Sequence, residues 1–441
     1  MFTYHMMGYY FRLGVRSLRR NPALTALMVL TLAIGVAASV STLTILHAMS
    51  GDPIPSKSER LFVPQFDLNP KEGYIPGADD VDMQMAYIDA NNLLRSGQGE
   101  RRSALYGVSM PLEPPRSDIA AFNASGLAAT RDFFAMFDVP FRHGQAWSEQ
   151  DDARRANVVV LSSEVAEKLF GQASPVGKQV RMKGQPFTVV GVLDNWVPVT
   201  RYYKLVGGEF PPAGEEFIIP FSTAIGMELP VYGSMWCNGQ RDSGYAALLT
   251  SNCTWIQFWF ETRSSLDRAG LQTWLDNYAA EQRKLGRLPR SAPNELYNVM
   301  EWMEKLKVVG NDTRLSAWLA FGFLILCLVN TIGLLMAKFS VRATEVGVRR
   351  ALGATRGDIF RQFLVETSVV GLAGGVLGLG LAFAALALIG MQSRDVAAAA
   401  RMDWQMLALT FVMSIAAAII AGLLPTWRAC QVTPAIQLKS Q

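Results

Sequence analysis

Four long apolar runs dominate the pattern of hydrophobic and polar positions along this chain. They cover residues 21–51, 315–337, 367–393 and 404–427, and none contains Asp, Glu, Lys or Arg. Each run is long enough to cross the apolar layer of a bilayer, which takes about 20 helical residues. Because a backbone in lipid must satisfy its own hydrogen bonds, each run is predicted to be a helix. The pattern therefore predicts an α-helical membrane protein with four transmembrane helices.

Residues 52–314, between the first two apolar runs, have the composition of a folded, water-soluble domain. The strand-like runs are residues 156–161, 179–182, 186–193 and 254–260, and the helix-like runs are residues 162–170 and 265–285. Ser162 or Ser163 is suited to cap the first of these helices. Strands interleaved with helices predict a large mixed α/β (α+β) domain. The prolines within residues 111–115 and 211–212 predict loops.

Basic residues beside the apolar runs predict the orientation. Residues 1–20 contain arginines and no acidic residue, arginines outnumber acidic residues in 338–366, and residues 394–403 are balanced. Loops rich in Lys and Arg stay in the cytoplasm, so residues 1–20, 338–366 and 428–441 are predicted to be cytoplasmic. Residues 52–314 and the short loop 394–403 are then outside. The net charge of +4 reflects this topology, and no nucleic-acid partner is predicted.

The N-terminal segment, residues 1–20, has two interpretations. Arg12, Arg16 and Arg20 would share one helix face, so the segment is suited to lie as an amphipathic helix along the cytoplasmic interface. The alternative is that these residues are topology charges and nothing more. The apolar run that follows is longer than the core of a cleaved signal, which favours a retained signal-anchor over cleavage.

Residues 338–366 are more strongly patterned than an ordinary cytoplasmic loop. Val346, Val348, Ala351 and Leu352 place apolar side chains beside the arginines, and Gly353 stands where a helix would end. A helix that lies between two membrane spans and faces the cytoplasm is suited to contact a partner protein and to be displaced by it.

The run EVGVRRALGAT, residues 345–355, closely resembles the cytoplasmic loop of MacB/FtsX-type ABC transporter permeases, the mechanotransmission (type VII) group. Residues 129–138 and 158–192, with the motifs Leu-Phe-Gly and Pro-x-Gly-Lys, are similar to the periplasmic core of the MacB family. The ending of the chain, residues 423–439, also resembles this family. The region 201–253 has no counterpart that can be placed, so specialisation could reside there.

This resemblance implies a bacterial inner-membrane permease that works with an ABC ATPase dimer. In this family, ATP-driven closure of the ATPase moves the periplasmic domains, and substrate is expelled from the periplasm. The implied partners are the ATPase and a second permease chain, which is either the same chain or a paralogue. Whether a periplasmic membrane-fusion adaptor and an outer-membrane channel also join the outer domain stays open. The implied coupling residues are Glu345, Val346, Val348, Arg349, Arg350, Leu352 and Gly353. Their charged members would contact the ATPase, and Val346, Val348 and Leu352 would fill a groove on it.

The cysteines follow the predicted topology. Cys237 and Cys253 lie in the outer domain, where an oxidising periplasm favours a disulfide between them. Cys327, in a membrane run, and Cys430, in the cytoplasmic tail, are expected to stay reduced.

Glycines of the third apolar run have a predicted packing role. Gly371, Gly374, Gly375 and Gly378 recur at spacings that let helices approach closely in lipid. The alternative is that glycine is simply common in membrane helices.

The sequence contains no recognisable catalytic or cofactor-binding motif. Residues 171–179 come nearest to a phosphate-binding loop, but their spacing is one residue too long and Gln179 stands where Ser or Thr must contact magnesium. The three histidines are widely separated, so no metal site is predicted. The chain is therefore expected to be no enzyme and to hold no cofactor, with ATP and Mg²⁺ bound by the partner ATPase.

Three other functions stay open. One is lipoprotein release, as in the Lol branch of the superfamily. Another is FtsX-like regulation of cell-wall hydrolases, although the outer region is larger than the FtsX type typically has. The third is a membrane-anchored sensor without an ATPase. The sequence does not identify the transported substrate.

The coupling assignment predicts the effect of a charge reversal. Replacing Arg349 and Arg350 by Glu should uncouple ATP hydrolysis from export, because like charges would then face the ATPase. Transport and ATP hydrolysis, measured together in reconstituted vesicles, check this. Unchanged coupling in the double variant would remove the assignment.

Overall fold

A computed structural model of the chain describes residues 21–72, 74–76, 83–116, 118–171, 174–196, 198, 200–205, 214–238, 243–392 and 404–430. The chain forms two compact units, a helical unit (residues up to Ser50 and from Val309) and an α/β unit (Gly51–Val308). The predicted N-terminal segment 1–20, the proline pair 211–212, the loop 394–403 and the tail from 431 onward lie outside the described residues.

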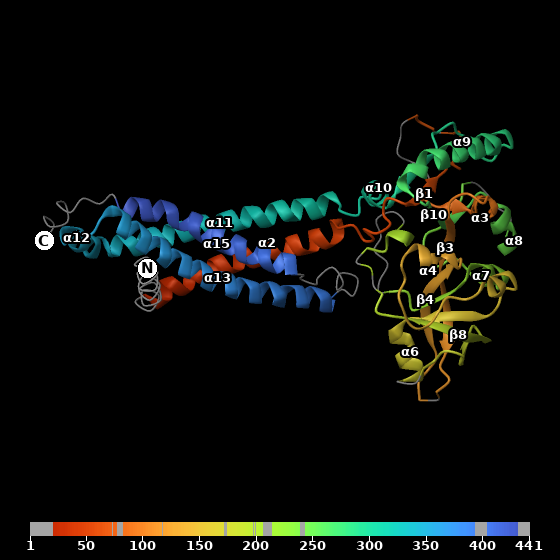
Figure 1. The fold of residues 1–441 in the computed structure, drawn as a ribbon, viewed down its shortest axis with the longest axis horizontal. Helices are drawn as coiled ribbons and strands as arrows, with labels where there is room; N and C mark the ends of the chain where they lie inside the picture. The colour runs from red at the N-terminus through yellow and green to blue at the C-terminus, as the bar shows by residue number, and fades with distance from the viewer. Residues whose placement is uncertain are drawn as a thin grey trace. The chain divides into compact units, whose positions relative to one another are not determined.

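The helical unit contains helices that run side by side (Figure 1). They are α2 (Pro22–Ser50), α11 (Asn311–Val341), α13 (Arg356–Gln392) and α15 (Trp404–Cys430), with the short α12 (Ala343–Ala351) between α11 and α13. Among the described residues, α2, α11 and α13 are long and apolar enough to cross a membrane. The described apolar part of α15, Ile415–Trp427, is shorter. The fourth span therefore stays a prediction, and the chain is a membrane protein with three such helices described.

Helix α2 is the most enclosed helix of this unit. Half of its apolar window is buried, against 22% in α11 and 28% in α13. It contacts α11, α13 and α15. Since α11 and α13 leave most of their apolar surface uncovered, α2 forms the centre of the described bundle.

Two glycines of α13 bring this helix close to α2. A Cβ atom added at Gly374 would lie 2.9 Å from Leu32 Cδ2, and one added at Gly378 would lie 3.0 Å from the carbonyl oxygen of Ala33. Gly371 and Gly375, the other two glycines of the predicted packing set, are also buried. Close approach through small residues replaces the hydrophobic effect as the source of helix association in lipid.

A third glycine contact joins α2 to α11. A Cβ atom at Gly35 would lie 2.9 Å from Cys327 Cβ. Ser39 of α2 also donates a hydrogen bond to the carbonyl oxygen of Ala320, at 3.0 Å. Helix α2 is therefore tightly packed on both of its long neighbours.

The α/β unit is built on one mixed sheet, and its strand order is β11-β1-β10-β3-β4-β9-β6-β8-β5, with β2 paired to β10 and β7 paired to β3 and β8. The described strands are β1 (Leu61–Gln65), β2 (Met85–Ala86), β3 (Arg101–Glu113), β4 (Phe122–Ala129), β5 (Phe141–Gly144), β6 (Val158–Leu161), β7 (Gln179–Met182), β8 (Gln185–Leu193), β9 (Phe217–Pro220), β10 (Thr254–Glu261) and β11 (Glu295–Asn298). The β4–β9 and β6–β8 pairs are parallel, and the other pairs are antiparallel. A mixed sheet with helices confirms the predicted mixed α/β class.

Helices and 3-10 turns cover both faces of this sheet. The described ones are α3 (Tyr87–Arg95), α4 (Asp132–Met136), α5 (Glu149–Ala153), α6 (Ser163–Phe170), α7 (Phe221–Gly226), α8 (Tyr245–Thr250), α9 (Arg268–Lys284), α10 (Val299–Lys305), η1 (Tyr202–Lys204) and η2 (Ser265–Asp267). Side chains alternate between two cores, as successive strand residues must. In β10, Phe258 and Phe260 enter the core beneath α3, α6, α7, α8 and α9, and Trp259 enters the core with α4, α10 and η1.

The strands and helices expected in this unit are largely confirmed. The four predicted strand runs correspond to β6, β7, β8 and β10, and the two helix-like runs correspond to α6 and to η2 with α9. Ser162 is the cap of α6, because its side chain accepts a hydrogen bond from the N–H of Val165 at 3.2 Å. The loop predicted at Pro111 is wrong, since Pro111 lies in β3 opposite Asn123. Proline lacks only the N–H, and its carbonyl oxygen still accepts a hydrogen bond from Lys183.

The contact between α13 and α2 predicts that a larger side chain lowers stability at a glycine that touches α2 and not at a glycine that faces open space. Gly378→Leu should destabilise the helical unit by about 1–3 kcal/mol, because the added atoms meet the backbone of Ala33. Gly380→Leu is the matched control, since an added Cβ there meets nothing within 4 Å. Thermal unfolding in detergent checks this. Equal midpoints for the two variants would contradict the close contact.

Candidate functional site

Helix α12 is separated from both flanking helices by short, well-defined turns. Arg342 alone stands between the end of α11 and the start of α12. After α12, Gly353 has a φ of +100°, in the left-handed region that favours glycine. Thr355 and Asp358 then cap α13 reciprocally, each accepting a hydrogen bond from the backbone N–H of the other at 3.2 Å. The helix end predicted at Gly353 is confirmed.

One side of α12 packs on the first turns of α13. Val346 is buried in a cluster with Phe339, Ile359 and Phe363. Arg349 donates hydrogen bonds to Gln362 Oε1 at 2.8 Å and to Glu345 Oε1 at 2.6 Å. Val346 and Arg349, both predicted to contact a partner, are therefore engaged inside this chain. Helix α12 and the start of α13 form one packed element.

The opposite side of α12 exposes two apolar residues. Val348 is 53% exposed and Leu352 is 83% exposed. Residues two apart on a helix do not share a face, which is why Val348 points away from the cluster that holds Val346. Of the predicted groove-filling set, Val348 and Leu352 are the side chains open to a partner.

A buried ion cluster joins the ends of α11 and α13. Glu366 Oε1 lies 2.7 Å from Lys338 Nζ, and Glu366 Oε2 lies 3.0 Å from a terminal nitrogen of Arg342. The side chains of Lys338 and Glu366 are 1% and 3% exposed. This cluster is not among the sites predicted from the sequence. One sequence feature could have predicted it. Lys338 and Glu366 flank two apolar runs, and a charged side chain that is buried needs a partner of opposite charge.

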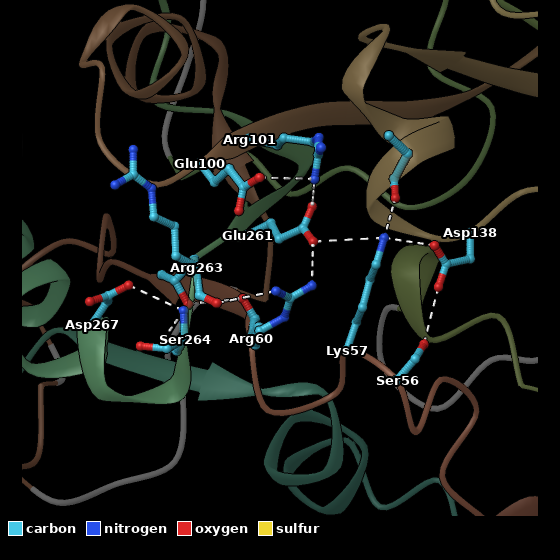
Figure 2. Close-up of polar contacts among 12 residues, drawn as sticks. Ser56, Lys57, Arg60, Glu100, Arg101, Asp138, Glu261, Arg263, Ser264 and Asp267 are labelled. Carbon is cyan, nitrogen blue, oxygen red and sulfur yellow. Dashed lines mark hydrogen bonds and ion pairs between the residues drawn. The ribbon is translucent and has the colours of Figure 1, made fainter.

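Glu261, at the end of β10, is one of several buried acidic residues of the α/β unit (Figure 2). Its side chain is fully buried. The carboxylate accepts hydrogen bonds from Arg60 at 3.1 Å and from Arg101 at 2.9 Å, and Lys57 Nζ lies 3.7 Å away. The bond to Glu261 raises the pKa of Arg101 above its ordinary value. Three cations therefore surround one carboxylate.

The Glu261 cluster fastens the segment that follows α2 along the chain. Lys57 also forms an ion pair with Asp138 at 2.7 Å, and Ser56 donates a hydrogen bond to the same carboxylate at 3.1 Å (Figure 2). Arg60 donates a further bond to the carbonyl oxygen of Arg263. Residues 56–60 are thereby attached to the sheet at β3 and β10 and to the end of α4. Sequence reasoning missed this cluster because its members are up to about 200 positions apart.

Cys237 and Cys253 are joined by a disulfide, with their sulfurs 2.05 Å apart. Beside it, Trp236 and Thr254 exchange backbone hydrogen bonds of 2.9 and 2.8 Å. Trp236 is nevertheless 61% exposed. This part of the region 201–253 is thus held rigidly against β10 while it presents an aromatic side chain to solvent. Cys327, the other cysteine whose side chain is described, is free and buried.

Comparison with known proteins gives two matching families. The family described as MacB-like periplasmic core domain matches residues 25–269, and the family described as FtsX-like permease C-terminal matches residues 317–434. The first match covers more than half of the chain.

Three relatives have similar levels of identity. The chain is 26% identical over 298 residues to the uncharacterized ABC transporter permease YknZ of Bacillus subtilis, covering 66% of this chain and 64% of that protein. It is 27% identical over 242 residues to the macrolide export ATP-binding/permease protein MacB of Bdellovibrio bacteriovorus, covering 54% of this chain and 32% of the relative. For the pyoverdine export ATP-binding/permease protein PvdT of Pseudomonas aeruginosa the identity is 26% over 316 residues, with 70% and 41% covered. The chain thus spans from about a third to just under two thirds of these relatives' lengths.

Neutralising the buried Glu261 is predicted to lower the stability of the α/β unit more than neutralising a carboxylate at the surface. Glu261→Gln should lower the free energy of unfolding of the α/β unit by about 3–5 kcal/mol, because it leaves cations without their buried partner. Glu149→Gln is the matched control, since Glu149 pairs with Arg131 at the surface and is 88% exposed. Denaturant unfolding followed by tryptophan fluorescence checks this. A Glu261→Gln protein as stable as the control would contradict a structural role for the cluster.

Proposed function

The chain belongs to the MacB/FtsX-type ABC transporter permeases, and from this premise we propose that it is the subunit through which a separate ABC ATPase drives export or efflux. The supporting observation is the two-sided character of α12. One side is fixed to α13 through Val346 and Arg349, and the other exposes Val348 and Leu352. A docking helix needs both properties, because it must contact a partner and must pass that contact's movement to its own chain.

The first step of the proposed mechanism is docking of α12 on the ATPase. Val348 and Leu352 enter an apolar groove, and Arg350 and the Glu345–Arg349 pair make the surrounding charged contacts. Gly353 lets the chain turn sharply, so that Leu352 stands at the end of the docking helix. ATP and Mg²⁺ are bound by the partner, whose closure on ATP displaces α12.

The second step is transmission through packed helices. A displacement of α12 moves the start of α13, because Val346 and Arg349 hold the two together. Helix α13 in turn contacts α2 closely, because the backbone of Gly374 lies against the Leu32 side chain and that of Gly378 lies against the backbone of Ala33. Helix α2 continues into residues 56–60, which the Glu261 cluster fastens to the sheet. In this mechanism the movement reaches the α/β unit along α2 and the segment that follows it.

The proposed setting is the bacterial inner membrane, with both termini and α12 in the cytoplasm and the α/β unit in the periplasm. An ABC ATPase dimer acts on this chain and on a second permease chain, and substrate is expelled from the periplasm rather than through the helices. A membrane-fusion adaptor and an outer-membrane channel complete the path. The macrolide and pyoverdine export named for two relatives supports a small-molecule substrate class.

The exposed side of α12 gives a direct test. In Val348→Asp/Leu352→Asp, the ABC ATPase recovered with the tagged chain in mild detergent should fall about tenfold, a loss of about 1.4 kcal/mol. Leu285→Asp is the control, because Leu285 is 71% exposed in the α/β unit. Mass spectrometry and ATPase assay of the purified material give the measurement.

Two outcomes would overturn the proposal. Equal recovery from the double variant and the control would remove α12 as the docking helix. Purification of the unaltered chain without any ATPase, even after crosslinking, would favour a membrane-anchored sensor.

A further inference from the structure

The geometry points to Glu366 as a positioning residue that fixes the orientation of α12 on α13 by holding the α11–α12 junction. This inference rests on the proposed function, because the orientation of α12 matters through the ATPase that docks on it. Glu366 itself is buried and does not face that partner.

Both carboxylate oxygens of Glu366 are directed at the junction. Oε1 lies 2.7 Å from Nζ of Lys338, in the last turn of α11. Arg342, the single residue between α11 and α12, donates to both oxygens, at 3.2 and 3.0 Å. One side chain of α13 thus binds the end of α11 and the start of α12 together.

The other contacts of α12 do not fix its angle to the same degree. Val346 packs in an apolar cluster, and apolar contacts are non-directional. The Arg349–Gln362 hydrogen bond is a single polar contact on a half-exposed side chain. The Glu366 carboxylate, in contrast, accepts two charge-assisted hydrogen bonds from Arg342, which are strong and directional, and it also forms a buried ion pair with Lys338. The orientation of α12 therefore depends most on Glu366.

Burial explains why this cluster is better suited to positioning than to stability. Taking charges out of water cancels much of their attraction, so apolar residues of similar volume often stabilise a fold as well as a buried ion pair does. Such residues would fill the space but would not fix the angle. An apolar replacement of the whole cluster separates the two roles.

The test measures the orientation of α12 directly. Spin labels are placed at Val348→Cys on α12 and Val376→Cys on α13 in the full chain in lipid nanodiscs, with Cys327 and Cys430 replaced by Ala. Both labelled positions are exposed, and Val376 lies about 20 Å along α13 from Phe363 at 1.5 Å per residue. Pulsed dipolar spectroscopy then gives the distance distribution between the labels.

Three variants are compared in this background. Glu366→Gln should broaden the distribution. Lys338→Leu/Arg342→Leu/Glu366→Leu should also broaden it while the thermal midpoint stays near that of the parent chain, which a purely stabilising role would not produce. Ser340→Ala, in the same turn of α11 and exposed, should leave the distribution narrow.

Function is read out separately in the same variants without labels. Glu366→Gln should still co-purify the ABC ATPase, and stimulation of that ATPase by the permease should fall about fivefold or more, the usual range of coupling between sites. Narrow distributions in both Glu366 variants would overturn the positioning role and leave the proposed function standing. Absence of any ATPase with the unaltered chain would overturn the proposed function, while the distance distributions would still decide the role of Glu366.

Discussion

The close contact between α13 and α2 is the interaction on which the helical unit depends. The chain crosses between its two units at Ser50–Gly51 and again at Val308–Val309. Helix α13 takes part in neither crossing, so a displacement of its first turns reaches the α/β unit through a neighbouring helix. Gly374 and Gly378 place the backbone of α13 directly against α2. Close-packed interiors transmit strain because they have little free volume to absorb it.

Each of the two units contains a buried carboxylate that is surrounded by cations, Glu261 in the α/β unit and Glu366 in the helical unit. Glu261 and Glu366 are each nearly inaccessible to solvent, and each is surrounded by more than one cation. Each also holds a place where the chain passes from one element to the next: Glu261 the segment after α2, and Glu366 the α11–α12 junction. Since a buried charge without its partner is costly, loss of either carboxylate should destabilise its cluster.

The apolar runs and strand patterns were readable from the sequence because they are local. Helix α6 with its cap Ser162, and strands β6, β7, β8 and β10, follow from side-chain periodicity alone. The partners of Glu261 and Glu366 could not be read in this way, because they are set by how distant segments meet. Pro111 was misassigned for another reason, since the proline signal for a loop was given too much weight in a strand that can do without its N–H.

The burial of Val346 and the exposure of Val348 could have been predicted. Both were assigned to one apolar stripe, yet residues two apart on a helix point to different sides. The structure buries the first and exposes the second. Applied to residues 345–352, that spacing alone separates the side of this segment that packs on α13 from the side that is exposed.

The single-residue junction at Arg342 makes α12 a short lever. Nine residues at 1.5 Å each give an arm of about 13 Å, so a tilt of 10° about the junction moves the far end by roughly 2 Å. Leu352, just beyond that end, moves farthest, and Val346, four residues from the junction, moves by only about 1 Å. In the proposed mechanism, a push on Leu352 would thereby become a smaller displacement with a larger force beside α13, and a longer α12 would give a larger displacement at its far end with a smaller force.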